Sequence, residues 1–238
     1  IIRKLKTKNY YTYGFDTKAN YQIYNFKSTI DYTKFDLKIK NLGSKNVSIN
    51  NISLKLIGKY NVLNATAAIA LCLNLGLKMK IIRKALENFS GVQRRLTKVF
   101  KKNKIEFYDD YAHHPTEIKC VIEAFRKVVP LRKIIIIFQP HRYSRVKTLN
   151  SEFASCFKKT NQVILCPVYA AGETIDKNYD HIKFAQLISK FSKTQVVNVK
   201  DELDITKYFR KNLSDDGIVI GMGAGSISKW MHNLKNNL

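Results

Sequence analysis

Two short polar segments carry most of the side chains that could do chemistry. Residues 109–117 read DDYAHHPTE, and residues 138–145 read FQPHRYSR. In the second segment Arg142 and Arg145 lie three positions apart. Two guanidinium groups at this spacing could form a fork for a carboxylate or phosphate, or they could be a solvated face. The two arginines follow Pro140 and His141, directly after the apolar run 134–138, and this position favours the fork.

The first segment also contains metal-binding groups. Asp110, His113 and His114 could form a metal site. Two adjacent histidines rarely point at one ion, however, and His114-Pro115 is as well suited to begin a helix. We predict no metal site in this chain.

The remaining candidate motifs are weaker. Residues 221–225 (GMGAG) could hold an anion on backbone N–H groups, or could serve close helix–strand packing. Arg94-Arg95 lies between the two halves of the chain and could be a basic linker or part of a site. The four cysteines, at 72, 120, 156 and 166, show no C-x-x-C spacing, which favours reduced core thiols. No G-x-x-x-x-G-K-[ST] occurs, so the chain has no phosphate-binding P-loop of its own.

The elements that must position these segments follow a strict strand–helix alternation after about Val92. Apolar strands are expected near 105–109, 134–138, 163–168, 195–199 and 217–222. Helical periodicity is expected at 118–125, 149–157, 184–191 and 227–234, with a weaker helix at 203–213. This alternation predicts a doubly wound α/β domain with a parallel sheet, in which ligands bind beyond the carboxyl ends of the strands. Both polar segments fall at such ends.

The first part of the chain has a different pattern. Phe35, Leu37 and Ile39 alternate with polar residues, which predicts a half-buried strand. Further strands are expected at 10–26 and 52–57, with a turn at 41–44. A helix is expected from Asn61 to Leu75, ended by Gly76, and a second one includes Ile82 to Phe89.

Charge is the most unusual feature of the composition. The chain has 42 Lys and Arg against 18 Asp and Glu, a net charge of +24. This balance is typical of nucleic-acid binders, but Lys, Asn and Ile together make up 79 of 238 residues, and all three have A/T-rich codons. We favour genome composition and expect no specific nucleic-acid partner. The chain contains no run of 18 apolar residues, so we expect no membrane span. The start at Ile1 without Met suggests a fragment of a longer chain.

The two polar segments together resemble the Mur ligase family. Segment 109–117 resembles the signature that opens the family's C-terminal domain, and segment 138–145 narrows the resemblance to the members that use L-alanine. Supporting matches are Thr12-Tyr13-Gly14, Asn61-x-x-Asn64-Ala65, Phe89-x-Gly91-Val92-x-Arg94-Arg95, Tyr169-x-x-Gly172-Glu173 and Gly223-Ala224-Gly225. The resemblance spans nearly the whole chain.

The resemblance implies a domain organisation and a reaction. Residues 1–92 would be the strand-and-helix end of a central ATPase domain, and residues 93–238 a complete Rossmann-like C-terminal domain. The implied reaction is ATP-dependent joining of L-alanine to UDP-N-acetylmuramate through an acyl phosphate, in cytoplasmic peptidoglycan precursor synthesis. The P-loop, the UDP-sugar domain and the Mg²⁺ ligands would lie upstream, so we expect the chain to be inactive alone.

The resemblance also assigns site residues. The L-alanine contacts would be Arg142, Arg145, His141, Tyr111 and His113. The ATP contacts would be Asn61, Asn64, Arg95 and Asp110. Two positions depart from the family pattern, since Tyr60 replaces a usual His and Ser226 a usual Asp or Asn. The alternatives are a related ligase for murein tripeptide, a basic nucleic-acid-binding α/β module, and a regulatory remnant that binds nucleotide or amino acid.

Overall fold

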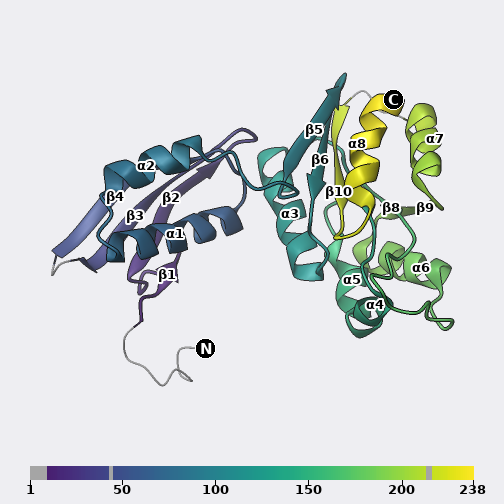
Figure 1. Cartoon of the computed structure of the whole chain (residues 1–238), viewed down its shortest axis with the longest axis horizontal. Coiled ribbons are helices and arrows are strands. Elements are labelled where there is room, and N and C mark those ends of the chain that lie inside the picture. The colour runs from purple at the N-terminus through teal and green to yellow at the C-terminus, as the bar shows by residue number, and fades with distance from the viewer. Residues whose placement is uncertain (1–9, 43–44, 213–215) are drawn as a thin grey trace. The chain divides into compact units, whose positions relative to one another are not determined.

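The computed structural model describes residues 10–42, 45–212 and 216–238. The chain divides into two compact units, Ile1–Ser90 and Gly91–Leu238 (Figure 1). Each unit has its own sheet, helices and apolar core, and each is described here by itself.

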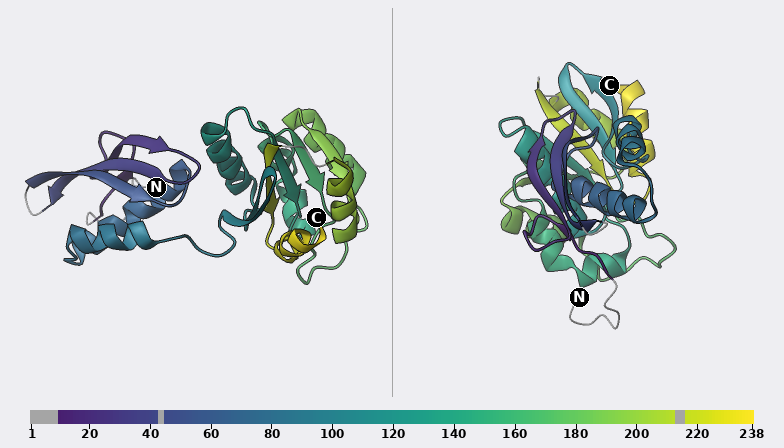
Figure 2. Two further views of the ribbon diagram at one scale, coloured as in Figure 1. Left: turned by 90° about the horizontal axis from the view of Figure 1, so that it is seen from above. Right: turned by 90° about the vertical axis from the view of Figure 1, so that its left-hand side faces the viewer.

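The first unit is a four-stranded sheet covered by two helices. Its strands are β1 (Tyr13–Gly14), β2 (Tyr21–Ser28), β3 (Thr33–Leu42) and β4 (Lys45–Leu54), in that order across the sheet. Strands β1 and β2 are parallel, and the other pairs are antiparallel. Helices α1 (Lys59–Asn74) and α2 (Met79–Asn88) lie on one face of this sheet (Figure 2, left). The core forms where alternate strand residues, such as Leu37, meet Val62 and Ile69 of α1.

The alternation at Phe35, Leu37 and Ile39 is confirmed, because all three side chains are buried. The strand expected over 10–26 is instead two strands with a turn between them, and β4 ends at Leu54 rather than Ile57. Gly76 follows α1 with φ +84°, as expected of a residue that ends a helix. Of the turn expected at 41–44, residues 43 and 44 lie outside the described residues.

The second unit contains a six-stranded sheet. Its strands are β5 (Thr97–Lys102), β6 (Lys104–Asp110), β7 (Ile134–Phe138), β8 (Gln162–Leu165), β9 (Gln195–Asn198) and β10 (Asp216–Met222). The order across the sheet is β5-β6-β10-β7-β8-β9. All neighbours from β6 to β9 are parallel, and only β5 is antiparallel. The predicted α/β class with a parallel sheet is confirmed.

Helices cover both faces of this sheet. They are α3 (Pro115–Val128), α4 (Tyr143–Thr148), α5 (Asn150–Cys156), α6 (His181–Ser192), α7 (Glu202–Asn212) and α8 (Ile227–Asn237). On one face Ile135 and Ile137 of β7 pack in a cluster with residues of α7 and α8. On the other face Phe138 contacts Phe153 of α5, with ring centroids 5.6 Å apart. Strand β7 is therefore buried along its whole length, as its unbroken apolar run predicts.

Two elements of the second unit were not predicted. Strand β5 pairs with β6 through an irregular register between Lys98 and Phe100, so its side chains do not alternate cleanly. Helix α4 begins at Tyr143, within a stretch expected to be loop, and is only six residues long. Arg145 therefore lies on a helix, and Arg142 immediately precedes it.

Candidate functional site

The loops that follow β6, β7, β8 and β10 meet at one edge of the second sheet. The Gly223 N–H donates to the Asp110 carbonyl at 3.2 Å, which joins the loops after β10 and β6. The Arg142 N–H donates to the Tyr169 carbonyl at 2.9 Å, and the Tyr169 N–H donates to the Pro140 carbonyl at 2.8 Å. These bonds hold together the two polar segments and the Tyr169 loop, which are far apart in the sequence.

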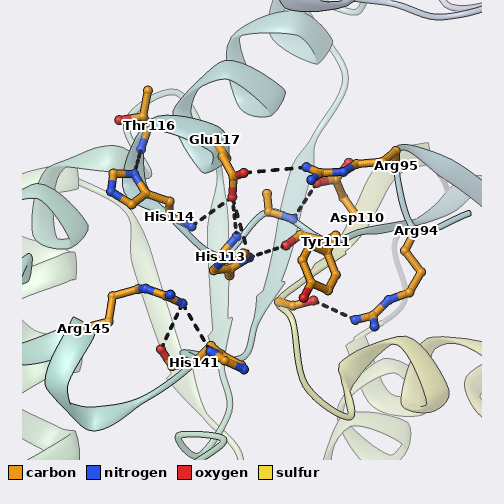
Figure 3. A network of polar contacts seen from close by, with 12 residues as sticks. Arg94, Arg95, Asp110, Tyr111, His113, His114, Thr116, Glu117, His141 and Arg145 are labelled. Carbon is orange, nitrogen blue, oxygen red and sulfur yellow. Dashed lines mark hydrogen bonds and ion pairs between the residues drawn. The ribbon is translucent and has the colours of Figure 1, made fainter. Parts of the chain in front are cut away.

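Within segment 109–117, strand β6 ends at Asp110 and helix α3 begins at Pro115, with His114 as its capping residue. The His114 ring Nδ1 accepts the Thr116 N–H at 3.3 Å, and Pro115 is the first residue of α3. The Glu117 carboxylate reaches back and accepts the N–H groups of His113 at 3.1 Å and His114 at 3.2 Å (Figure 3). This is a capping box in which histidine takes the place of the usual hydroxyl residue. The helix-starting role that the sequence allowed for His114 is confirmed.

Tyr111 lies between two arginines. The guanidinium carbons of Arg94 and Arg95 lie 4.8 Å and 5.4 Å from the centre of its ring. Arg94 also donates to the Gly223 carbonyl at 2.9 Å, and Arg95 pairs with Glu117 at 3.7 Å. In Figure 3 the two arginines flank the tyrosine from the same stretch of chain. The Arg94-Arg95 pair thus packs on segment 109–117 and is not a free basic linker.

Four aromatic and histidine rings form a row across the loops at the carboxyl ends of the strands. Ring centroids are 5.1 Å apart for Tyr111 and His113, 5.7 Å for His113 and His141, and 5.7 Å for His141 and Tyr169. An Arg145 guanidinium nitrogen lies 3.2 Å from the Nδ1 atom of His141. Burial lowers the pKa of His141, and the positive charges of Arg145, His113 and Arg142 lower it further. A neutral His141 ring can accept a hydrogen from Arg145, which fixes the direction of that guanidinium.

Arg142 has an uncommon backbone conformation and an exposed side chain. Its φ is +69° and its ψ 132°, a combination that residues with a Cβ rarely adopt. Within the part of the chain that the structure describes, no hydrogen bond or ion pair engages its guanidinium. The next residue but one, Ser144, donates its N–H to the Glu173 carboxylate at 3.2 Å, and its hydroxyl donates to the same group. The strained turn is thus held in place from the Tyr169 loop, and it leaves the Arg142 side chain available for a ligand.

Asp109 and Asp110 at the end of β6 are both buried. Asp110 is 2% exposed, and its two oxygens accept the N–H groups of Ala112 and Leu96, each at 2.8 Å. Burial raises the pKa of Asp110 to about 6, although these two hydrogen bonds and the charge of Arg95 oppose the shift. Asp109 accepts the Ser228 hydroxyl at 2.5 Å. Asp110 therefore ties the strand end to the adjoining loops, and Asp109 ties it to the start of α8.

Asn61 and Asn64 lie in the first unit, three residues apart near the start of α1. The Asn61 amide donates to the Ile57 carbonyl at 2.8 Å, and this side chain is half-buried. Asn64 is exposed. The two amides share one helix face, because residues three apart are neighbours on a helix.

The glycines of the 221–225 loop serve close packing. A Cβ on Gly221 would lie 2.3 Å from the Met231 side chain, and one on Gly223 would lie 2.8 Å from the Gln139 carbonyl oxygen. A Cβ on Gly225 would lie 2.5 Å from both Gln139 and Tyr169. The packing alternative for this loop is therefore the one that the structure supports.

Three residues of this region were not named as site residues from the sequence. They are Glu117, Glu173 and Gln139, of which Gln139 contacts Ser226 at 2.9 Å and the Ile227 N–H at 3.0 Å. Glu117 has a sequence signal, since a Glu three positions after a capping residue is typical of a helix start. Glu173 and Gln139 lie within segments that the sequence singled out, but their contacts join residues far apart in the sequence, so no local pattern indicates those contacts.

Two classes of site are missing from the described residues. No group of three or more His, Cys, Asp and Glu side chains there could hold a metal ion. No described helix is both long and apolar enough to cross a membrane. The four cysteines are unpaired thiols, of which Cys156 and Cys166 are buried and Cys72 and Cys120 are only half-buried.

Comparison with known protein families identifies the class of protein to which this fold and this group of loops belong. The family "Mur ligase, glutamate ligase domain" matches residues 94–225, and "Mur ligase middle domain" matches residues 1–72. The chain belongs to the Mur ligase family, which confirms the resemblance noted from its two polar segments.

Particular members of the family are similar over the whole chain. A UDP-N-acetylmuramate–L-alanine ligase from Pelagibacter ubique is 47% identical over 234 residues, which are 98% of this chain and 50% of that protein. The enzyme of the same name from Caulobacter vibrioides is 32% identical, over 100% of this chain and 50% of its own length. The chain thus spans about half the length of these relatives.

Solved structures also match most of this chain and about half of their own length. A UDP-N-acetylmuramate-alanine ligase from Thermotoga maritima superimposes with a TM-score of 0.76 at 27% identity, covering 95% of this chain and 47% of that one. A murein peptide ligase from Psychrobacter arcticus has a TM-score of 0.64 at 19% identity over 95% of this chain and 45% of that one, and it shares the fold.

Proposed function

We propose that this chain is part of an ATP-dependent ligase that joins L-alanine to UDP-N-acetylmuramate in peptidoglycan precursor synthesis, a reaction we assign to the cytoplasm. The observation that carries the proposal is the row of Tyr111, His113 and His141 beside Arg142 and Arg145, at the carboxyl edge of a parallel sheet. The 47% identity to an enzyme of that name supports the choice of amino acid.

In this proposal the second unit captures the amino acid. Arg142 and Arg145 bind the alanine carboxylate, since guanidinium groups form strong charge-assisted bonds with carboxylates. His141, Tyr111 and His113 orient the bound alanine so that its amine can attack the activated muramate carbonyl. Holding the two reactants in line removes much of the entropic part of the barrier. The amine forms the new amide bond, and phosphate leaves from the acyl phosphate.

Four residues are proposed nucleotide contacts, and the structure suits them unequally. Arg95 has a half-exposed guanidinium that can reach a phosphate, and Asn64 is exposed on α1. The side chains of Asn61 and Asp110 already have backbone partners and can offer only their remaining hydrogen-bonding capacity. We propose that Mg²⁺ accompanies the bound ATP, and none of these four residues is assigned as its ligand.

The proposal is tested by titrating the 238-residue chain with L-alanine and following its amide NMR signals. Arg145→Ala should weaken binding by roughly tenfold or more, because it removes a charge-assisted hydrogen bond worth about 1.5–3 kcal/mol. Lys147→Ala is the matched control, since Lys147 is an exposed base on the same helix. Equal affinity of Arg145→Ala and the unmodified chain would contradict the proposed alanine site.

Two further titrations separate the alternatives. A murein tripeptide that binds more tightly than L-alanine would favour the tripeptide ligase. Tight DNA or RNA binding with a steep dependence on salt would favour a nucleic-acid module, since each neutralised phosphate releases counterions. We expect neither result, and we expect no ligation by the 238-residue chain, because it lacks a P-loop.

A further inference from the structure

A single carboxylate, that of Glu117, contacts both proposed groups of ligand-binding residues. Its Oε1 atom lies 3.7 Å from a guanidinium nitrogen of Arg95, a proposed nucleotide contact. Its Oε2 atom accepts the backbone N–H of His113, a proposed alanine contact, and lies 3.7 Å from the Nδ1 atom of that ring. Figure 3 shows a contact from Glu117 to Arg95 on one side and contacts to His113 and His114 on the other.

The two arginines beside Tyr111 differ in how firmly they are held. Arg94 donates to the Gly223 carbonyl at 2.9 Å and lies 4.0 Å from the buried Asp109. The side chain of Arg95 is 51% exposed and has the long ion pair with Glu117 and the contact with the Tyr111 ring. A half-exposed ion pair of this length is weak. Arg95 can therefore turn towards a phosphate at little cost, whereas Arg94 cannot.

We propose that Glu117 is a positioning residue that couples nucleotide binding to alanine binding, an inference that rests on the proposed function. When a phosphate takes Arg95, the Glu117 carboxylate loses its cation and accepts the N–H groups of His113 and His114 more strongly. Hydrogen bonds to an ionised acceptor are strong, so the backbone at His113 and His114 is held more firmly. ATP thereby strengthens alanine binding, and by reciprocity alanine strengthens ATP binding by the same factor.

The first test compares the affinity for L-alanine with and without saturating ATP. An exposed ion pair changes an equilibrium by at most about fivefold, so ATP should lower the Kd for alanine about two- to fivefold in the unmodified chain. Glu117→Gln should still bind alanine, but ATP should leave its Kd unchanged. Glu123→Gln is the matched control, because Glu123 is exposed on the same helix and pairs with Lys159 at 3.8 Å. This control should keep the full ATP effect.

The second test needs no substitution. ATP added alone should shift the backbone amide NMR signals of His113 and His114, because both N–H groups donate to Glu117. The inference is overturned if ATP moves neither signal, or if the ATP effect on alanine affinity is the same in Glu117→Gln and the unmodified chain. Either result leaves the alanine site itself intact. Failure of the unmodified chain to bind alanine would instead overturn the proposed function together with the coupling.

Discussion

Replacing Arg142 by glycine should change stability and ligand binding in opposite directions. Arg142 adopts φ +69° and ψ 132° at the entry to α4, and its N–H donates to the Tyr169 carbonyl. Glycine adopts this backbone conformation without the Cβ clash and keeps the N–H bond. It also removes the guanidinium that we assign to the alanine carboxylate. Arg142→Gly should therefore be a more stable protein that binds alanine poorly.

The size of each effect follows from the structure. A residue held in a sparsely populated backbone region stores of order 1–3 kcal/mol, and the greater freedom of glycine in the unfolded chain offsets about 0.5–1 kcal/mol of this. The free energy of unfolding of Arg142→Gly should exceed that of Arg142→Ala by about 1 kcal/mol. Loss of a charge-assisted hydrogen bond of about 1.5–3 kcal/mol should raise the Kd for alanine roughly 10- to 150-fold in both variants.

The assay pairs urea unfolding with an alanine titration on three proteins, namely the unmodified chain, Arg142→Ala and Arg142→Gly. Arg142→Ala keeps the strained backbone conformation but loses the guanidinium charge. It therefore separates the effect of backbone strain on stability from the effect of the charge on ligand binding. If Arg142→Gly is less stable than Arg142→Ala, the turn is not strained as described. If both variants bind alanine like the unmodified chain, Arg142 does not contact the carboxylate.

Three further predictions concern stability and can be checked by urea unfolding. Gly221→Ala should lower the free energy of unfolding by about 1–3 kcal/mol, because its Cβ would lie 2.3 Å from Met231. Arg132→Met should cost about 1–3 kcal/mol, because it removes the 2.9 Å bond from Arg132 to Glu106. The raised pKa of Asp110, about 6 against an ordinary 3.8, means that the folded state binds this proton more tightly than the unfolded chain. The contribution of Asp110 is therefore most favourable below pH 4 and falls by ~3 kcal/mol as the pH rises through 6, a pH dependence that Asp110→Asn should lack.

Much of the second unit could be predicted because most of its strands contain a short apolar run and most of its helices have a clear period. Strand β7, whose residues 134–138 are all buried, is the plainest example. Strand β5 was missed because its irregular pairing with β6 between Lys98 and Phe100 breaks the alternation that identifies a strand. Helix α4 was missed because six residues are too few for a helical period to show.

The location of the candidate site could be predicted from the sequence, but the contacts between its side chains could not. Topology alone brings Tyr111, His141 and Arg142 to one sheet edge, since the carboxyl ends of parallel strands lie together. The sequence could not indicate that Glu173 holds Ser144, because that contact joins residues 29 positions apart. Nor could it show that Asp110 is buried, because burial depends on how Leu96 and Ala112 fold around it.

The strand order of the second unit has a consequence for its synthesis. Strand β10 is the last of the described strands to leave the ribosome, yet it lies between β6 and β7 and pairs with both. Until residues 216–222 emerge, β6 and β7 face each other across a missing strand, each with an unpaired edge. Such edges are templates for pairing with other chains. The unit therefore completes its folding only after residues 216–222 have emerged, and a nascent chain stalled before Asp216 depends on chaperones to keep it from aggregating.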